Sequence, residues 1–349
     1  MSLSDDDLRS AFAGGIYLHA VNGPLTHNAG CLIEGLLDLG VPVEISTDKV
    51  TSRPVSMPLK DVELDKMVAP PRHDHSGYVV DISHTNTFTP VEGVKTSRVA
   101  YLNQSDIGLF CSLPEQHLLF IAHSSTFAKK GGLRYPVAFG LSKGLIDSTD
   151  QRCAFSERRP IALRNFRATL SQSLRALLDI SFVSMLERKI EIDWNNSGPG
   201  QYLNAMLNSK MCLAYGGDFY TPISTNPWFK KNQPDLAQVH TFIDMEVPAL
   251  VQRWDSFRLW ESFAAGTLAI HLNFDKYGFS LPEMPVAWTH YAPIDLDDIA
   301  GSVREILNRE DKWAEIAEMG RAWAIAHYAP RPTAIRMLST MLNYRKNSD

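Results

Sequence analysis

The sequence has 349 residues, of which 44% are hydrophobic and 21% charged, and its formal net charge is -5. This length suits two domains of ordinary size, and the composition is that of a globular protein with a sizeable core. The mildly acidic balance gives no sign of a nucleic acid or an anionic membrane surface as partner, so we expect neither.

The cysteines and the N-terminus indicate the cellular compartment. Four cysteines are widely scattered, without the spacing of a zinc site or a disulfide framework: Cys31, Cys111, Cys153 and Cys212. The run MSLSDDDLRSAF is acidic and lacks the basic start and apolar core of a signal peptide. Apolar stretches such as 118–122 are too short to cross a bilayer. We therefore expect a cytoplasmic protein without a transmembrane segment.

The first part of the chain predicts strands that alternate with helices or loops. A strand at 16–21 precedes a turn-rich loop, a helix at 29–39 that ends before Gly40, and a strand at 41–46. Further short apolar runs predict strands at 78–83, 98–103, 117–123 and 135–140. This alternation is typical of a parallel α/β sheet.

The polar segment 142–160 has weak periodicity, and we place a domain boundary there. The pattern then begins again, with strands at 161–166, 189–195, 211–217 and 267–272 and helices at 168–180 and 201–210. Helices at 296–308, 311–328 and 333–345 close the chain. We predict an α/β protein of two Rossmann-like domains that face a cleft, 1–150 and 151–330, followed by a C-terminal segment, 331–349.

The run RWDSFRLWESFAAGTLAI, residues 253–270, predicts a helix that carries charges where it leads into a core strand. Asp255 or Ser256 can cap this helix, which leaves amide groups and a positive dipole end in its first turn. The rings at 257, 260 and 263 form the core face, while Arg258 and Glu261 lie on the other face. Such a helix start suits a nucleotide, because amides bind phosphate and a carboxylate binds ribose hydroxyls. The alternative is an Arg258–Glu261 pair on a solvated face.

Together with the run NSKMCLAYGGDFYT, this segment resembles the donor-binding half of GT-B glycosyltransferases, especially their exostosin-like and group 1-like branches. The matching positions are Ser209, Lys210, Leu213, Gly216, Ser256, Arg258, Glu261 and Gly266. The tail MGRAWAIAHYAPRPTAIRMLSTML is similar to the closing helices of that fold, the last of which crosses back to the N-terminal domain. The run THNAGCLIEGLLDLGVPVEI resembles the first loop and helix of a GT-B acceptor domain.

The resemblance implies that the second domain binds a nucleoside diphosphate sugar and the first domain an acceptor such as a glycan. Glu261 would hold the donor ribose, and basic residues would neutralise the diphosphate. The donor-site candidates are Arg164, Arg167, Lys210, Tyr215, Gly216, Asp255, Ser256, Arg258 and Glu261. The acceptor-side loop would include His27 and Asn28. Arg253 stands where retaining group 1 enzymes often carry a second Glu, so the stereochemistry of transfer stays open.

A catalytic base is expected at the carboxyl ends of the first domain's strands, because open α/β sheets bind ligands there. His19, His84 and His123 occupy such positions, and Asp81 precedes His84 on the same segment. Histidine suits removal of a proton from a sugar hydroxyl near neutral pH. Each of these histidines could instead be a hydrogen-bonded structural residue.

The sequence gives no support for a metal site or a dinucleotide-binding site. Asp295 and Asp297 form a DxD pattern, but acidic residues at a helix start are favourable for dipole reasons, so we reject a metal site there. GxGxxG and the P-loop are both absent. We therefore expect a metal-independent glycosyltransferase without a further cofactor. The alternatives are a sugar-nucleotide epimerase of the same fold and a non-catalytic two-lobed binding protein.

Overall fold

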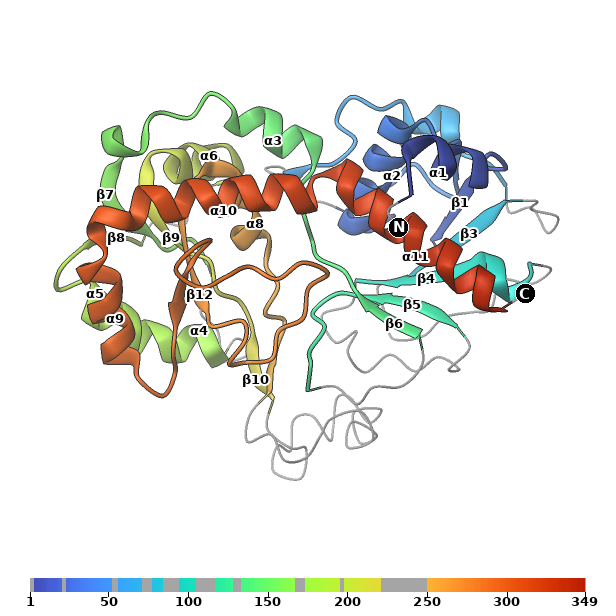
Figure 1. The fold of residues 1–349 in the computed structure, drawn as a ribbon. Coiled ribbons are helices and arrows are strands. Elements are labelled where there is room, and N and C mark those ends of the chain that lie inside the picture. The colour runs from blue at the N-terminus through green and yellow to red at the C-terminus, as the bar shows by residue number, and fades with distance from the viewer. Residues whose placement is uncertain are drawn as a thin grey trace. The chain divides into compact units, whose positions relative to one another are not determined.

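The computed structural model describes residues 3–20, 23–51, 56–70, 77–83, 94–104, 117–127, 133–166, 173–194, 198–220 and 250–348, and all structural statements below concern these residues. The chain divides into two compact units. Unit 1 comprises 1–124, 130–144 and 326–349, and unit 2 comprises 125–129 and 145–325 (Figure 1). The division between 144 and 145 lies in helix α3 (Lys143–Thr149), within the segment 142–160.

Unit 1 contains a six-stranded parallel sheet in the order β2-β1-β3-β4-β5-β6. Its strands are β1 (Ile16–Ala20), β2 (Val43–Ile45), β3 (Tyr78–Ser83), β4 (Val99–Asn103), β5 (Leu118–Ile121) and β6 (Leu133–Pro136). The chain passes from β1 to β2 on one side and continues with β3 on the other. The strand order therefore reverses between β1 and β3, which is where open α/β sheets bind ligands.

The helices of unit 1 are α1 (Asp5–Ala11), α2 (His27–Leu39) and α11 (Pro330–Ser348), with short 3-10 turns η2 (Leu64–Met67) and η3 (Thr96–Arg98). Thr26 caps α2, accepting a hydrogen bond from the Ala29 amide, and Gly40 ends the helix in a left-handed conformation at φ 72°. Only a residue without a side chain adopts that conformation at little cost. The predicted end of this helix before Gly40 agrees with the structure.

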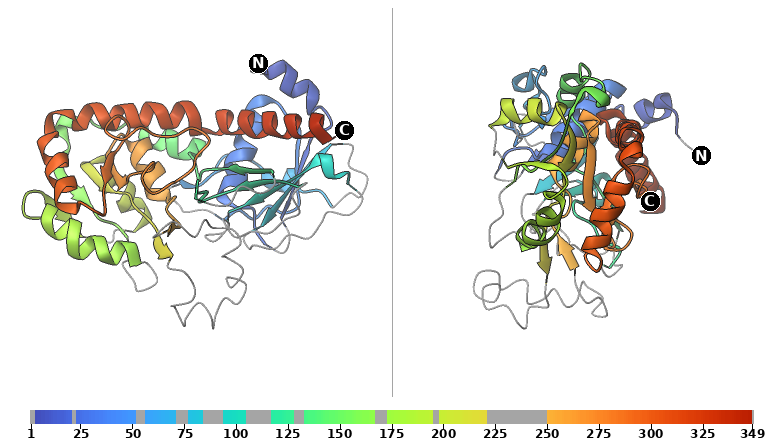
Figure 2. Two further views of the ribbon diagram at one scale, coloured as in Figure 1. Left: turned by 60° about the horizontal axis from the view of Figure 1, so that its bottom comes forward. Right: turned by 90° about the vertical axis from the view of Figure 1, so that its left-hand side faces the viewer.

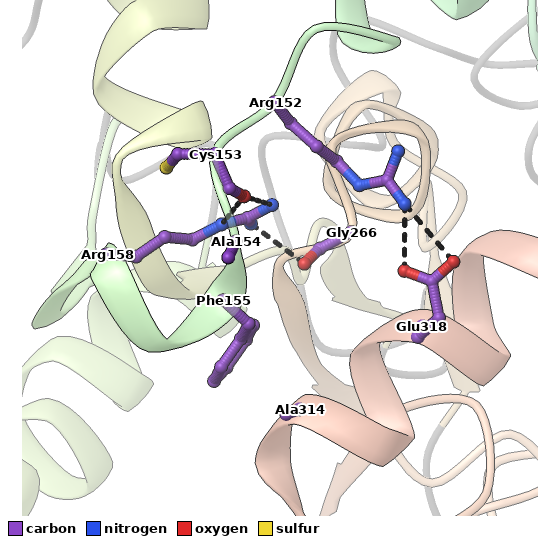
Figure 3. Close-up of a pocket in the computed structure, with 8 residues that line it drawn as sticks. All are labelled: Arg152, Cys153, Ala154, Phe155, Arg158, Gly266, Ala314 and Glu318. Carbon is purple, nitrogen blue, oxygen red and sulfur yellow. Dashed lines mark hydrogen bonds and ion pairs between the residues drawn. The ribbon is translucent and has the colours of Figure 1, made fainter.

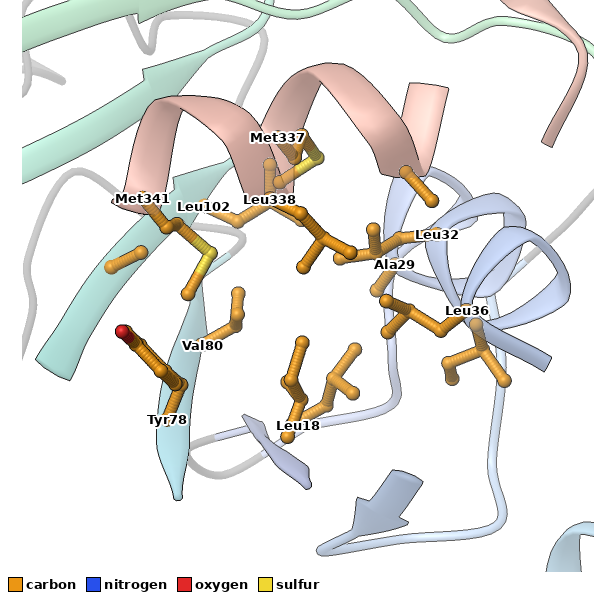
Figure 4. Packing of buried hydrophobic residues seen from close by; sticks show 14 of the residues in the cluster. Leu18, Ala29, Leu32, Leu36, Tyr78, Val80, Leu102, Met337, Leu338 and Met341 are labelled. Atoms are coloured by element: carbon orange, nitrogen blue, oxygen red, sulfur yellow. The ribbon is translucent and has the colours of Figure 1, made fainter. Parts of the chain in front are cut away.

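Helix α11 returns to unit 1 and completes its core (Figures 1 and 2). Met337, Leu338 and Met341 are buried in the same cluster as Leu32 and Leu36 of α2 (Figure 4). The Arg331 guanidinium adds ion pairs to Asp5 and, at 2.9 Å, to Asp38. The predicted return of the C-terminal helix to the N-terminal domain is therefore confirmed.

Unit 2 contains a five-stranded parallel sheet in the order β13-β12-β9-β7-β8. Its strands are β7 (Arg159–Leu163), β8 (Glu191–Asp193), β9 (Ser209–Leu213), β12 (Leu268–Leu272) and β13 (Ala292–Ile294). A separate antiparallel pair joins β10 (Asp218–Tyr220) to β11 (Leu250–Gln252). Here the strand order reverses between β7 and β9. Both units are thus parallel α/β sheets, as the sequence predicts.

Helices pack on both faces of the second sheet. On one face α6 (Pro199–Leu207) contacts β9 and α8 (Phe257–Ala265), which also contacts β12. A helical segment formed by α4 (Ser173–Leu178), a π-helix η6 (Asp179–Val183) and α5 (Ser184–Leu186) contacts α9 (Ile299–Asn308). The remaining elements are η5 (Phe155–Glu157), η9 (Glu310–Lys312) and α10 (Trp313–Tyr328).

Two helices end at other residues in the structure than the sequence predicts. The helix predicted at 201–210 ends at Leu207, and Ser209 and Lys210 instead begin β9, because Ser209 pairs with Arg159 of β7. The helix predicted to end at 180 continues through the π-helix to Leu186. Within the described part of the chain, no helix is long and apolar enough to cross a membrane.

Candidate functional site

The carboxyl ends of β7 and β9 mark the place in unit 2 where a ligand is expected, because the strand order reverses between them. Loop residues Arg164, Asn165 and Phe166 follow β7 directly, and Tyr215 and Gly216 follow β9. The Phe166 and Tyr215 rings lie with their centroids 5.3 Å apart. The two loops therefore meet over the end of the sheet.

Three arginines surround the Phe166 ring. The guanidinium carbons of Arg164, Arg175 and Arg258 lie 4.3, 5.2 and 5.8 Å from its centroid. They come from the loop after β7, from α4 and from the first turn of α8. All three are largely buried, with 7%, 8% and 7% of their surface exposed. We call these residues the arginine cluster. Such a concentration of buried positive charge is suited to binding an anion.

Arg164 already has an anionic partner within the protein. Its Nε and Nη2 donate to the two carboxylate oxygens of Asp179 at 3.0 and 2.5 Å, and its Nη1 donates to the Phe166 carbonyl at 2.9 Å. This bidentate pair offsets the charge of Arg164 and fixes the loop after β7. Arg164 was predicted to bind phosphate, but these contacts are those of a structural residue that fixes the loop.

Arg175 was not among the residues singled out from the sequence. It lies in the first turn of α4, the helix that follows β7, and such helices begin at the carboxyl edge of the sheet. That position is the signal that could have identified it. A Cβ built on Gly216 would lie 3.5 Å from Arg175 Nη2 and 2.9 Å from the Arg253 carbonyl, so Gly216 allows a close approach of backbone beside this arginine.

The start of α8 contributes positive dipole and amide groups. Ser256 is its N-cap residue, but the Ser256 hydroxyl donates to the Ala214 carbonyl at 2.7 Å instead of accepting from a first-turn amide. The Asp255 carboxylate accepts from Trp260 Nε1 at 2.6 Å. The Ser256 side chain therefore does not cap the first turn. The Arg258 Nε donates to the Asn165 carbonyl at 2.5 Å, which joins α8 to the loop after β7.

Glu261 is completely buried, and its predicted bond to a donor ribose stays a prediction. Burial raises the pKa of the Tyr202 hydroxyl, and the nearby Glu261 raises it further. Burial also raises the pKa of the Cys212 thiol to about 12, with Arg258 and Glu261 acting on it in opposite directions. Glu261 and Arg258 thus belong to one buried group with Tyr202 and Cys212. The alternative of a solvated surface pair is wrong, because neither side chain is on a solvated face.

The structure does not bring Lys210 to the arginine cluster. Lys210 is the second residue of β9, and its Nζ lies 5.9 Å from the ring of Phe155, which precedes β7. Because β7 and β9 are parallel, Lys210 lies at the edge where the strands begin, opposite the carboxyl edge. Arg167, also predicted to bind phosphate, lies outside the described residues.

A pocket of about 280 Å³ opens at this opposite edge (Figure 3). It is lined by Arg152, Cys153, Ala154, Phe155, Arg158, Gly266, Ala314 and Glu318. The Arg158 guanidinium donates to the Ala265 and Gly266 carbonyls at 2.9 and 2.8 Å, and so satisfies the C-terminal end of α8. Arg152 pairs with Glu318 at 2.9 Å. These arginines are bound by protein groups that account for their positions.

In unit 1 the reversal of strand order brings together two of the predicted catalytic residues. His19 of β1 and Asp81 of β3 are register partners, and His19 Nδ1 lies 3.2 Å from Asp81 Oδ1. The Asp81 side chain is fully buried, while 24% of the His19 side chain is exposed. Burial raises the pKa of the Asp81 carboxyl, and its interaction with His19 opposes that rise. A partly exposed histidine ring thus lies within ion-pair distance of a buried carboxylate.

The other N-terminal candidates occupy more enclosed positions. His123 is buried with a left-handed backbone at φ 55°, and its ring lies edge-on to Phe139. His27, the first residue of α2, is buried, and burial lowers its pKa to about 3, so it is neutral near pH 7. Asn28 donates from Nδ2 to the Ala138 carbonyl at 2.8 Å. His84 lies outside the described residues.

The DxD pattern has a structural explanation. Lys276 Nζ pairs with Asp295 and, at 2.7 Å, with Asp297. Asp298 caps α9, accepting a hydrogen bond from the Gly301 amide at 2.8 Å. Among the residues that the structure describes, no group of three or more His, Cys, Asp or Glu side chains is placed to hold a metal ion.

Comparison with known proteins identifies the fold. No protein-family model and no curated protein matches this sequence. Among solved structures, an alpha-glucosyltransferase in complex with UDP aligns over 94% of this chain and 99% of its own, at 11% identity and a TM-score of 0.51. The alpha-glucosyltransferase in complex with UDP-glucose and DNA containing an abasic site has the same coverage, at 10% identity and a TM-score of 0.53. The chain therefore has the two-domain GT-B fold of glycosyltransferases, as the sequence predicts.

Proposed function

We propose that this protein transfers a sugar from a nucleoside diphosphate donor to a hydroxyl acceptor. The observation that carries the proposal is the arginine cluster at the carboxyl ends of β7 and β9. A nucleoside diphosphate sugar has the anionic group that this cluster suits, and its leaving group is a diphosphate that gains charge as the sugar departs. The GT-B fold of the similar structures supports the same conclusion.

The arginines and the start of α8 would do what a metal ion does in other transferases. Arg175 and Arg258 supply fixed positive charge, and the first-turn amides of α8 add hydrogen-bond donors. Arg164 keeps the loop after β7 in place through Asp179. We infer from this arrangement that transfer does not depend on a metal ion.

His19 is our candidate for the residue that takes the proton from the acceptor hydroxyl. Asp81 lies close enough to accept a hydrogen bond from a protonated Nδ1, which would leave Nε2 to accept a proton. A carboxylate behind the ring also stabilises the imidazolium that forms. His123 is less favoured, because it is buried.

The similar structures suggest which donors and acceptors to test. These alpha-glucosyltransferases are complexes with UDP or UDP-glucose, and one also contains a DNA with an HMU base. Uridine diphosphate sugars are therefore the first donors to try. Acceptors should include glycans, which the resemblance implies, and DNA with an HMU base, which the acidic composition disfavours.

The test is release of nucleoside diphosphate from a panel of such donors, with and without acceptors. We expect acceptor-dependent release by the natural protein and a turnover about 10²- to 10⁴-fold lower in His19→Ala, the usual contribution of a general base. Asp81→Asn should also lower turnover, because the amide cannot orient the same tautomer. Donor affinity should be unchanged in both variants. If His19→Ala had the same turnover as the unaltered protein, His19 would not be the residue that accepts the proton.

A further inference from the structure

We propose that Trp194 is the platform on which the donor's nucleobase stacks. This inference rests on the proposed function and extends it to the subsite for the base. Trp194 follows β8, and Asp193 of β8 is the register partner of Leu163 of β7. The next residues, Trp194 and Arg164, are therefore neighbours at the carboxyl edge of the sheet.

The ring of Trp194 lies directly beside the arginine cluster. The Arg164 guanidinium carbon is 4.8 Å from the Trp194 ring centroid and 4.3 Å from the Phe166 ring centroid. Trp194 and Phe166 thus contact the same guanidinium, and Phe166 also contacts the other two arginines. In a nucleotide only the ribose separates the base from the diphosphate. A diphosphate at the cluster would therefore bring its base within reach of Trp194.

Exposure sets Trp194 apart from other tryptophans. The side chains of Trp254, Trp260, Trp313 and Trp323 are buried, whereas Trp194 is 46% exposed. One face of the indole is covered by a guanidinium that Asp179 holds in place, so the ring is supported while much of its surface remains open. A rigid aromatic ring of this kind is what a flat, uncharged base needs for stacking.

The competing explanation is that Trp194 only shields the Arg164–Asp179 pair from water. Both explanations predict some loss of stability when the ring is removed. They differ in what happens to ligands, because a shield affects every ligand of the cluster alike, whereas a stacking platform affects only ligands that carry a base. Inorganic pyrophosphate, which has the diphosphate and no base, therefore separates the two.

The experiment measures the affinities of UDP, GDP, ADP and pyrophosphate for the full-length protein and for three variants. Trp194→Ala removes the ring, and Trp194→Phe keeps an aromatic face. Trp288→Ala is the control, since Trp288 also stacks on an arginine of unit 2, Arg309, at 4.6 Å. Arg309 follows the last residue of α9, the helix after β13, which places that pair at the opposite edge of the sheet.

We expect Trp194→Ala to weaken the preferred nucleoside diphosphate about 5- to 100-fold, as base stacking on an aromatic side chain does, and to leave pyrophosphate within about twofold. Trp194→Phe should restore most of the affinity, and Trp288→Ala should change neither ligand. If Trp194→Ala lost affinity equally for the nucleotide and for pyrophosphate, or lost none for the nucleotide, the stacking role would be overturned. The proposed donor site would not be affected by either result. If the natural protein bound pyrophosphate and none of the nucleotides, both the stacking role and the proposed function would fall.

Discussion

At the scale of single residues, the candidate donor site is made of charged groups that the fold buries. Arg164, Arg175, Arg258 and Glu261 are each at most 8% exposed. Burying ionised groups is costly unless hydrogen bonds and opposite charges compensate. The Asp179 carboxylate does so for Arg164, and the Asn165 carbonyl accepts from Arg258. An arrangement that costs this much stability is typical of a functional site.

Glu261 offers a sharp test at this scale, because its proposed bond to the donor ribose and its burial predict different effects. In Glu261→Gln the side chain keeps its volume and loses its charge. We expect nucleoside diphosphates to bind about tenfold to a hundredfold more weakly, since one hydrogen bond to a charged group contributes about 1.5–3 kcal/mol. Pyrophosphate affinity should stay the same, because the ribose is absent. Affinities would be measured by titration calorimetry.

The free energy of unfolding provides the second readout for Glu261→Gln. It should fall by about 1 kcal/mol or more, since a buried carboxylate near Arg258 is lost. The matched control is Glu305→Gln, which breaks the exposed Glu305–Arg309 pair on α9 and should cost only about 0.2–0.5 kcal/mol. An unchanged nucleotide affinity in Glu261→Gln would make Glu261 a purely structural residue.

Sequence reasoning found some of these residues and missed others for physical reasons. Helical periodicity separates Arg258 and Glu261 from the aromatic core face of α8, but it does not reveal that both side chains are buried. Lys210 was misplaced because a helix end and a strand start are hard to separate when the connection is the single residue Asn208. The pairing of His19 with Asp81 depends on which strands are neighbours, and strand order is not encoded locally.

At the scale of elements, the close contact between α2 and α11 fixes the C-terminal helix on unit 1. Gly35 lies in the middle of α2, where a glycine normally weakens a helix. A Cβ on Gly35 would lie 2.2 Å from the Pro330 carbonyl oxygen and 2.7 Å from the Ala334 Cβ. The glycine is therefore required by the approach of α11, and no side chain fits between the two helices.

Gly35→Ala tests this contact. In an isolated helix the change should stabilise by about 1 kcal/mol. Here we expect the free energy of unfolding to fall by about 1–3 kcal/mol, because α11 must shift away from α2. Chemical denaturation of the full-length protein would measure it. Leu37→Ala is the control in the same helix, since Leu37 is 40% exposed and should cost less than about 1 kcal/mol. A stabilised Gly35→Ala would contradict the packing described here.

Elements with strong local signals could be predicted, and others could not. Apart from β13, each strand of the two sheets overlaps a strand predicted from an apolar run, and turn residues predict the end of α2 at Gly40. The π-helix at Asp179–Val183 has no such signal, because its extra residue per turn depends on packing. It places Asp179 where the carboxylate reaches Arg164, so a local irregularity helps to build the site.

At the scale of the whole molecule, the sheets of the two units share the same connectivity of their first three strands. In each unit the first strand is followed by a neighbour on one side and then by strands on the other. His19 and Asp81 lie at this reversal in unit 1, and the arginine cluster lies at the reversal in unit 2. Each sheet thus presents charged side chains where parallel sheets bind ligands. The proposed function assigns donor binding to the second of these places and proton transfer to the first.

The measurement that tests this account most directly is the unfolding temperature of the full-length protein with nucleoside diphosphates, with and without EDTA. A ligand of the folded state at a hundredfold excess over its Kd stabilises by about 2.7 kcal/mol. We predict that at least one nucleoside diphosphate raises the unfolding temperature and that EDTA does not reduce the effect. Arg175→Gln should abolish it, whereas Lys210→Ala, at the opposite edge of the sheet, should retain it. No stabilisation by any nucleoside diphosphate, or equal loss in the two variants, would contradict a donor site at the arginine cluster.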